Sequence, residues 1–305
     1  MPHVARRIDD EKARLMRMRS MLFVPGDSDR KFAKARTSAA DLLIFDLEDA
    51  VAPSQKDTAR ATVAGWLDEA GNLDAAMFVR INPLDTGLTQ ADLEAVVKPG
   101  LTGIMLPKSN GAQDVESVSV MIDPLEQAAG MEPGSIKIIV VATETAAAMF
   151  ALGSYAPAHP RLIALTWGAE DLGAAIGVTT NKEEDGSWTL PFKVARAQCL
   201  FAAANAGVTP IETIHANFRD LEGLEATGRN SRRDGFLGQM AIHPDQVDTI
   251  NRCFTPSEDE IAQARNIVDA FAANPDAGTL GIDGKMYDIP HLKAARKTLA
   301  AVEEG

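Results

Sequence analysis

The sequence of 305 residues lacks several features that mark common protein classes. It has only two cysteines, Cys199 and Cys253, without companions at metal-finger spacing, which argues against a disulfide scaffold and a structural zinc site. No run of about 18 uncharged apolar residues occurs, because Lys137 and Glu144 interrupt the most apolar stretch, residues 136–152. We therefore expect no membrane span.

Basic residues are also scarce. The chain has 30 Lys and Arg against 43 Asp and Glu, a formal net charge of −13, so phosphate backbones and anionic lipids would repel it wherever no local basic patch exists. We expect neither nucleic-acid nor membrane partners. Residues 1–19 mix acids with bases and have no apolar centre, which fits neither a secretory signal nor a transit peptide, so we expect a cytoplasmic protein.

Three enzyme signatures are missing as well. Residues 24–27, Val-Pro-Gly-Asp, are not the glycine fingerprint of a dinucleotide-binding domain. The sequence contains no G-x-x-x-x-G-K-[ST] loop for nucleotide hydrolysis and no G-x-S-x-G elbow for a serine nucleophile. These absences argue against all three chemistries.

Short apolar segments of β type alternate with longer helical patterns along the chain. The eight predicted strands are 21–24, 42–47, 77–81, 103–106, 136–143, 162–166, 210–214 and 240–242. Predicted helices between them include 29–39, 54–70, 89–97, 114–129, 145–152 and 192–206. Eight β–α units in roughly 250 residues predict an α/β protein, a (β/α)₈ TIM barrel, with a doubly wound open sheet as the competing architecture.

The pattern divides the chain into three predicted parts. Residues 1–19 form an N-terminal extension, residues 20–254 a TIM-barrel catalytic domain, and residues 255–305 a C-terminal helical segment. A new helix is expected after Ser257, a good N-cap residue that three acidic residues follow. Glycines punctuate the stretch 278–284 within the last part.

Polar residues follow nearly every predicted strand, and the carboxyl ends of barrel strands form the active-site rim in such folds. Glu144 follows the fifth strand and Asp171 follows the sixth. Two carboxylates at one rim suit a hard cation such as Mg²⁺, which keeps several waters beside one or two protein carboxylates. Each acid also stands where it could cap the next helix, and position alone weighs the two interpretations equally.

Three other rim residues have competing interpretations. Arg80 suits bidentate capture of a carboxylate, although position alone slightly favours a structural ion pair with a neighbouring strand-end acid. Lys108 would be a Schiff-base nucleophile only if buried and deprotonated, and an ion pair with a rim carboxylate is the simpler expectation. His243 is a candidate acid/base, with a hydrogen-bonded structural histidine as the favoured alternative.

The first predicted helix is a local exception to the acidic chain. It carries Arg30, Lys31, Lys34 and Arg36 within seven residues. These cations fit a phosphate-bearing ligand, although a solvated helix face is the default interpretation of such a run.

Eight motifs carry a resemblance to a known family. They are Ser-Met-Leu-Phe-Val-Pro-Gly (20–26), Phe-Asp-Leu-Glu-Asp-Ala-Val-Ala-Pro (45–53), Val-Arg-Ile-Asn (79–82), Leu-Pro-Lys (106–108), Glu-Thr-Ala (144–146), Gly-Ala-Glu-Asp-Leu (168–172), Met-Ala-Ile-His-Pro (240–244) and the tail Lys-Met-Tyr-Asp-Ile-Pro-His-Leu (285–292). In this order they resemble the citrate lyase β-subunit-like family of the HpcH/HpaI aldolase superfamily. This family includes malyl-CoA and citramalyl-CoA lyases.

The resemblance implies the residues of the site. Its metal, Mg²⁺ with Mn²⁺ as the alternative ion, would be held by Glu144 and Asp171. The substrate-binding residues that it implies are Arg80, Gly168, Ala169 and Glu48, with the guanidinium on the carboxylate of a 2-oxo acid. The residues that it implies for coenzyme A are Phe23, Arg30, Lys31, Lys34 and His243.

The tail motif implies a further catalytic residue. Asp288 corresponds to the family's catalytic acid/base, which acts together with Arg80 and which related enzymes supply from the neighbouring subunit of a trimer or larger oligomer. Residues 255–305 would then be a lid that closes over the thioester, in a homotrimer or hexamer.

The implied activity is a Mg²⁺-dependent carbon–carbon lyase. It would cleave a 3-hydroxyacyl-CoA such as citramalyl-CoA or malyl-CoA to acetyl-CoA or a homologue plus pyruvate or glyoxylate. Two alternatives remain: a malyl-CoA-type thioesterase, and a citrate lyase β subunit that acts on a citryl-acyl carrier protein.

Overall fold

Eight parallel strands close into a barrel in the computed structural model, which describes residues 16–69, 71 and 73–303. The strands are β1 (Ser20–Pro25), β2 (Leu42–Asp46), β3 (Ala76–Arg80), β4 (Gly103–Leu106), β5 (Lys137–Val141), β6 (Leu162–Thr166), β7 (Thr209–Glu212) and β8 (Gly238–Ala241). Each strand pairs with the next in sequence, and β8 closes on β1. The predicted (β/α)₈ TIM barrel is confirmed.

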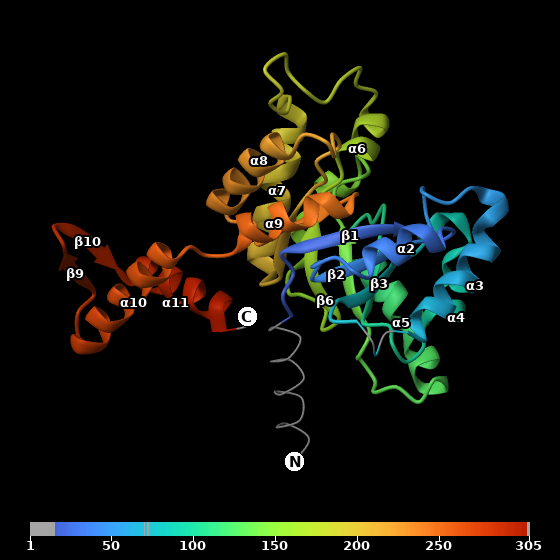
Figure 1. Cartoon of the computed structure of the whole chain (residues 1–305), viewed down its shortest axis with the longest axis horizontal. Helices are drawn as coiled ribbons and strands as arrows, with labels where there is room; N and C mark the ends of the chain where they lie inside the picture. The colour runs from blue at the N-terminus through green and yellow to red at the C-terminus, as the bar shows by residue number, and fades with distance from the viewer. Residues whose placement is uncertain (1–15, 70, 72, 304–305) are drawn as a thin grey trace. The chain divides into compact units, whose positions relative to one another are not determined.

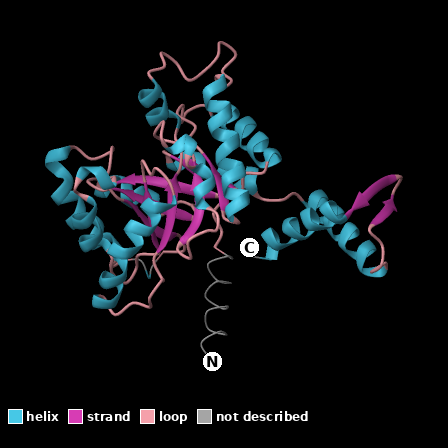
Figure 2. Cartoon of the chain, turned by 180° about the vertical axis from the view of Figure 1, so that it is seen from behind, coloured by secondary structure: helices cyan, strands magenta, loops and turns pink. Residues whose placement is uncertain are grey.

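Helices surround the barrel strands, as the cyan and magenta ribbons of Figure 2 show. They are α2 (Asp29–Ala35), α3 (Lys56–Leu67), α4 (Thr89–Val96), α5 (Ala112–Ala128), α6 (Ala169–Ile176), α7 (Leu190–Ala206), α8 (Leu221–Asp234) and α9 (Val247–Phe254). Short 3₁₀ turns add η1 (Pro53–Gln55), η3 (Leu84–Thr86), η4 (Ala148–Phe150), η5 (Leu152–Tyr155) and η6 (Pro244–Gln246). Because helices cover the sheet, strands such as β2 are buried along their whole length.

The register of the first strands places two charged residues side by side. In the β1–β2 pair, Pro25 lies opposite Asp46, and in the β2–β3 pair Asp46 lies opposite Arg80. Parallel strands present their carboxyl ends at one rim, so a strand that ends in an acid and a neighbour that ends in an arginine meet there.

One predicted helix is wrong. No α-helix forms over residues 145–152, where the chain makes the 3₁₀ turn η4 and enters the next one, η5. The Thr145 hydroxyl accepts the Ala148 N–H at 3.0 Å, which closes a tight turn. Phe150 is 94% exposed, so the segment lacks the continuous apolar face that would stabilise so short a helix by packing.

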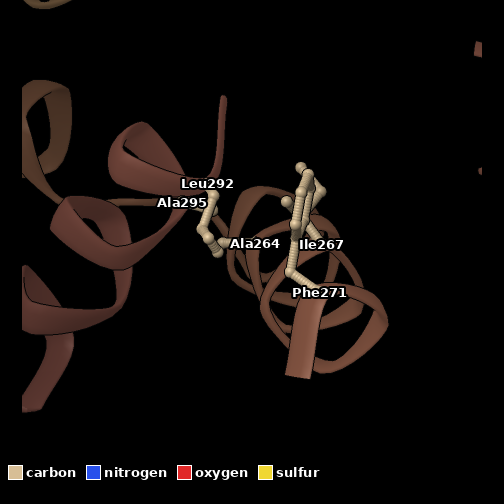
Figure 3. Packing of buried hydrophobic residues seen from close by; sticks show 5 residues of the cluster. All are labelled: Ala264, Ile267, Phe271, Leu292 and Ala295. Carbon is tan, nitrogen blue, oxygen red and sulfur yellow. The ribbon is translucent and has the colours of Figure 1, made fainter. Parts of the chain in front are cut away.

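The chain divides into two compact units, residues 18–251 and a second unit that contains residues 252–303. The second unit consists of α10 (Glu258–Ala273), β9 (Thr279–Ile282), β10 (Lys285–Asp288) and α11 (Ile289–Glu303), which appear in orange and red in Figure 1. Its own small core is formed by Ala264, Ile267, Phe271, Leu292 and Ala295, drawn in Figure 3. Ser257 caps α10 through a reciprocal pair of bonds with Glu260.

The predicted C-terminal segment is helical in α10 and α11, and between these helices β9 and β10 form an antiparallel hairpin. Ile282 pairs with Lys285, so the connection is the dipeptide Asp283-Gly284. Both residues have positive φ, 49° and 76°. This is the geometry of a type I′ turn, whose twist matches that of the strands, and Asp-Gly is one of its preferred sequences.

Two further expectations concern the termini and the membrane. Residues 1–15 of the predicted extension lie outside the described residues, whereas the guanidinium and backbone N–H of Arg19 bond the Asp41 carboxylate just before β2. In the described part of the chain, no helix is both long enough and apolar enough to cross a bilayer.

Both cysteines are buried, as expected for core residues.

Candidate active site

A pocket of about 480 Å³ opens where the strands of the barrel end. Its lining includes the last residues of β1, β2 and β3 and the residues that follow β5, β6, β7 and β8. Ten of the predicted site residues line it: Phe23, Arg30, Lys31, Lys34, Arg80, Glu144, Gly168, Ala169, Asp171 and His243. Residues scattered over 220 positions of sequence therefore share one cavity, which is the arrangement expected of a barrel active site.

Arg80 is held rigidly at the pocket wall. Its Nε and Nη2 donate to the two carboxylate oxygens of Asp46 at 2.8 and 2.5 Å, and its Nη1 lies 3.0 Å from Glu48 Oε2. The Phe23 ring lies 4.8 Å from the guanidinium carbon. Burial works to lower the pKa of Arg80, but the adjacent carboxylates outweigh it and raise that pKa. The structural ion pair therefore exists, and it presents a fixed, charged guanidinium to the pocket.

Lys108 lies among the rim carboxylates. Its Nζ is 2.5 Å from Glu48 Oε1, 3.0 Å from Asp49 Oδ2 and 3.3 Å from Asp171 Oδ1. Although burial opposes it, this group of acids raises the pKa of Lys108. The predicted ion pair is confirmed, and an ammonium held so firmly protonated is unsuited to act as a Schiff-base nucleophile.

Glu144 is a buried carboxyl group, 5% exposed, that follows β5. Its Oε2 accepts the backbone N–H of Lys108 at 2.6 Å. Burial, with added repulsion from Glu48 and Asp171, raises the pKa of Glu144 to about 8 against the opposing effect of that N–H. The groups around Glu144 do not balance the cost of burying its negative charge, so a cation bound there would stabilise the ionised form.

The residues present fit a Mg²⁺ ion. Asp171, in the first turn of α6, lines the same pocket as the buried Glu144. Among the described residues, no group of three or more His, Cys, Asp and Glu side chains forms a closed metal cage. Two carboxylates beside an open cavity leave room for waters and substrate oxygens, which is how proteins usually hold Mg²⁺.

Helix α2 supplies the positive wall of the pocket. Arg30, Lys31 and Lys34 are exposed and line it, while the Phe32 ring stacks on Trp66 on the opposite side of the helix at 4.6 Å. Trp66 in turn donates from Nε1 to Asp29 at 2.9 Å. The aromatic contact fixes the rotation of α2, so three cations face the cavity of an otherwise acidic chain.

His243 has both a structural role and a place in the pocket wall. Its Nδ1 accepts the Asp245 N–H at 3.3 Å and caps η6, and its ring stacks on Phe218 at 4.9 Å. The favoured expectation of a hydrogen-bonded histidine agrees with these contacts.

The sequence pattern of the HpcH/HpaI aldolase/citrate lyase family matches residues 19–244, which is most of the chain. The chain belongs to this family. The predicted resemblance is thereby confirmed, and with it the class of enzyme, a lyase.

Individual members of the HpcH/HpaI family cover almost the whole chain. A (3S)-malyl-CoA thioesterase of Cereibacter sphaeroides is 36% identical over 93% of this chain and 94% of its own length. The citrate lyase β subunit of Haemophilus influenzae is 34% identical over 94% of this chain and 97% of its own. The CitE protein of Mycobacterium tuberculosis, solved with magnesium, acetoacetate and coenzyme A, is 30% identical, covers 95% of this chain and 99% of its own, and has a TM-score of 0.76.

Asp288 lies in the second compact unit, where it ends β10 and precedes α11. Its Oδ1 is 2.5 Å from His291 Nδ1 and accepts the His291 N–H at 3.4 Å, which is the position of an N-cap residue. The hydrogen bond with His291 lowers the pKa of Asp288. An ionised carboxylate next to an imidazole is chemically able to accept a proton.

Two residues gain significance only from the structure. Asp46 orients Arg80 through two hydrogen bonds. The two residues end neighbouring strands in register, and this pairing is the feature from which the contact could have been predicted. His291 pairs with the Asp288 carboxylate, and its spacing of three residues from Asp288 fits a capping pair at the start of α11. Glu48 does not line the pocket but contacts both Arg80 and Lys108.

Proposed function

We propose that this protein is a Mg²⁺-dependent carbon–carbon lyase that cleaves a 3-hydroxyacyl-CoA to acetyl-CoA, or a homologue, and pyruvate or glyoxylate. The observation that carries the proposal is one pocket that combines a fixed guanidinium, two carboxylates suited to Mg²⁺ and a cationic wall. The CitE structure with magnesium, acetoacetate and coenzyme A, at 30% identity, supports the same combination of ligands.

Each wall of the pocket then has a task. Arg80 pairs with the carboxylate of the 2-oxo acid part, because a planar guanidinium matches two carboxylate oxygens. The free N–H groups at the start of α6, beginning with Ala169, stabilise the same anionic end. Arg30, Lys31 and Lys34 attract the phosphates of coenzyme A. Glu144 and Asp171 would hold the Mg²⁺ ion, which would supply Lewis-acid polarisation of the hydroxyl or oxo oxygen.

The bond changes are those of a retro-Claisen cleavage. A base takes the proton of the substrate hydroxyl, the carbonyl of the 2-oxo acid forms, and the electron pair of the broken carbon–carbon bond passes to the thioester enolate. Protonation of the enolate carbon gives acetyl-CoA, so no oxidant or other co-reactant is needed. In the proposal Asp288 is this acid/base, since its half-buried carboxylate has a lowered pKa and is ionised near neutral pH.

A panel of CoA esters analysed by mass spectrometry tests the proposal. We expect acetyl-CoA and pyruvate or glyoxylate from citramalyl-CoA or malyl-CoA, and loss of activity with a chelator or in Glu144→Ala and Asp171→Ala. Full activity in chelator, or unchanged activity in both variants, would show that the metal assignment is wrong.

Thioester hydrolysis is the second candidate, because the (3S)-malyl-CoA thioesterase is 36% identical over 93% of the chain. The same panel separates the two, since hydrolysis releases free CoA together with intact malate or citramalate. A citrate lyase β subunit would instead act on an acyl carrier protein, and the cationic wall of α2 favours a nucleotide ligand over it.

The proposal also includes an oligomer, a homotrimer or hexamer, in which residues 255–305 form a lid and Asp288 serves the neighbouring subunit. Mixing tests this arrangement. Asp288→Asn and Glu144→Gln subunits should each be inactive alone, and subunit exchange should restore a fraction of the wild-type rate. If native mass spectrometry shows exchange without recovered turnover, Asp288 acts within its own subunit or is not the base.

A further inference from the structure

Lys108 contacts the acidic cluster from both its backbone and its side chain. Its N–H donates to Glu144 Oε2 at 2.6 Å, and its Nζ lies within 3.3 Å of carboxylate oxygens of Glu48, Asp49 and Asp171. One residue thus bridges four carboxylates, including both of the proposed metal ligands.

The backbone of Lys108 is bent to make these contacts possible. Its φ is 50°, in the left-handed region, which within the described residues only one other non-glycine residue, Asp283 of the hairpin turn, shares. A lysine adopts this conformation at a cost, so the surrounding structure must hold it there. The next residue, Ser109, is buried and its hydroxyl lies 3.0 Å from the buried Tyr155 hydroxyl, which anchors the loop.

The position of the ammonium creates a competition for Asp171. The 3.3 Å contact uses an oxygen of the same carboxylate that would ligate Mg²⁺. A divalent ion placed between Glu144 and Asp171 would repel the ammonium strongly at such short range, because both charges lie in a partly buried site.

We propose that Lys108 is a resident counter-cation of this cluster, which holds the carboxylates together before a divalent ion arrives and releases Asp171 when the ion binds. The inference rests on the metal site of the proposed function. Lys108 is then a positioning residue that sets the affinity and selectivity of the site for its metal, in addition to fixing Glu144 through its N–H.

Metal binding in the absence of substrate tests the proposal. Lys108→Gln removes the charge but keeps a polar side chain, one atom shorter than lysine, and the backbone N–H to Glu144. Mn²⁺ titration followed by electron paramagnetic resonance should show at least about tenfold tighter binding. Lys108→Arg keeps the charge and should stay within about threefold of wild type. Equal or weaker Mn²⁺ binding by Lys108→Gln would overturn the proposal.

Lys98→Gln is the matched control. Lys98 also pairs with an acid, Asp68 at 2.7 Å, but does not line the pocket, so its loss should leave the Mn²⁺ affinity unchanged. If this control tightens Mn²⁺ binding as much as Lys108→Gln does, the effect is one of general charge and the proposal fails.

Thermal unfolding gives a second readout. In chelator, Lys108→Gln should melt about 3 °C or more below wild type, because the carboxylates around position 108 repel one another once the ammonium is gone. Saturating Mg²⁺ should reduce this difference in melting temperature. A gap that is the same with and without Mg²⁺ would overturn the proposal while leaving the lyase assignment intact. Absence of Mn²⁺ binding in wild type and variant alike, together with turnover in chelator, would instead remove the metal from the proposed function.

Discussion

Gly168 determines where the Glu144 carboxyl group lies. A Cβ atom at position 168 would fall 2.7 Å from Glu144 Cγ and 3.0 Å from its Oε1, closer than such atoms normally approach. The backbone of Gly168 has φ −114° and ψ 121°, which any residue adopts, so the requirement for glycine is one of space and not of conformation. Besides its predicted role in substrate binding, Gly168 therefore leaves the space in which Glu144, the proposed metal ligand, is seated.

We predict that Gly168→Ala reduces turnover and Mn²⁺ affinity at least about tenfold with little change in melting temperature, because the added methyl group pushes Glu144 out of place. Mn²⁺ titration and steady-state kinetics measure both effects. Gly65→Ala is the control: no atom lies within 4 Å of its added Cβ in the middle of α3, so it should stabilise the fold by about 0.5–1 kcal/mol without altering kinetics. Wild-type kinetics in Gly168→Ala would contradict the argument.

A buried ion pair between Arg161 and Glu126 links α5 to the barrel. Arg161, 3% exposed, donates to both carboxylate oxygens of Glu126 at 2.7 Å and to the Ile136 carbonyl at 3.0 Å. Glu126 also accepts the N–H groups of Gly134 and Ile136. Burial opposes ionisation, but Arg161 and these two N–H groups outweigh it and lower the pKa of Glu126 below its ordinary value of 4.5.

This shift has a defined effect on stability against pH. Because the folded-state pKa is depressed, the stabilisation is complete above pH 4.5 and is lost as the pH falls through the lower folded-state value. We predict that Glu126→Gln costs about 3 kcal/mol at pH 7 and less at pH 4, measured by urea unfolding. Glu116→Gln, an exposed site on the same helix that pairs with His159, should cost less than about 0.5 kcal/mol at both pH values. If the loss of unfolding free energy in Glu126→Gln is the same at pH 4 and pH 7, the lowered pKa of Glu126 does not contribute to stability.

Asp288 combines a proposed chemical role with a structural one at the start of α11. Asparagine is as good an N-cap as aspartate but cannot accept a proton as a base. We predict that Asp288→Asn loses turnover while melting within about 2 °C of wild type and binding CoA normally, whereas Asp288→Ala also melts at a lower temperature because the cap is lost. Calorimetry and steady-state assays separate the two roles, and an Asp288→Asn variant that keeps most of its kcat would point to another base.

The strands were predictable from the sequence, because most are short, largely buried apolar runs, such as β2 and β6, and polar residues lie at or just after their carboxyl ends. This rule also brought Arg80, Glu144 and Asp171 to one rim. It could not reveal the left-handed backbone of Lys108, since the loop that holds this conformation is anchored by the hydrogen bond of Ser109 with Tyr155, 46 positions further along the chain. Alanine-rich residues 145–152 failed as a helix because tertiary context overrode local propensity.

Charge at the scale of the whole molecule is uneven in a way that matters for binding. The chain carries −13, so an anionic CoA ester is repelled at long range, yet Arg30, Lys31 and Lys34 line the pocket. Attraction between exposed charges is screened over about 10 Å at 0.1 M salt. An affinity that depends on this wall must therefore weaken as the ionic strength rises.

We predict that KM for the CoA ester rises several-fold between about 0.05 and 0.5 M salt while kcat stays nearly constant, because the wall contributes to binding and not to bond cleavage. Lys31→Ala with Lys34→Ala should raise KM at low salt and flatten its salt dependence. Arg36→Ala is the matched control on the same segment, since Arg36 bonds Glu69 at 2.8 Å and does not line the pocket. A substrate truncated before the nucleotide phosphates should show no salt dependence with any of these proteins, and salt-dependent binding of that substrate would place the phosphate contacts elsewhere.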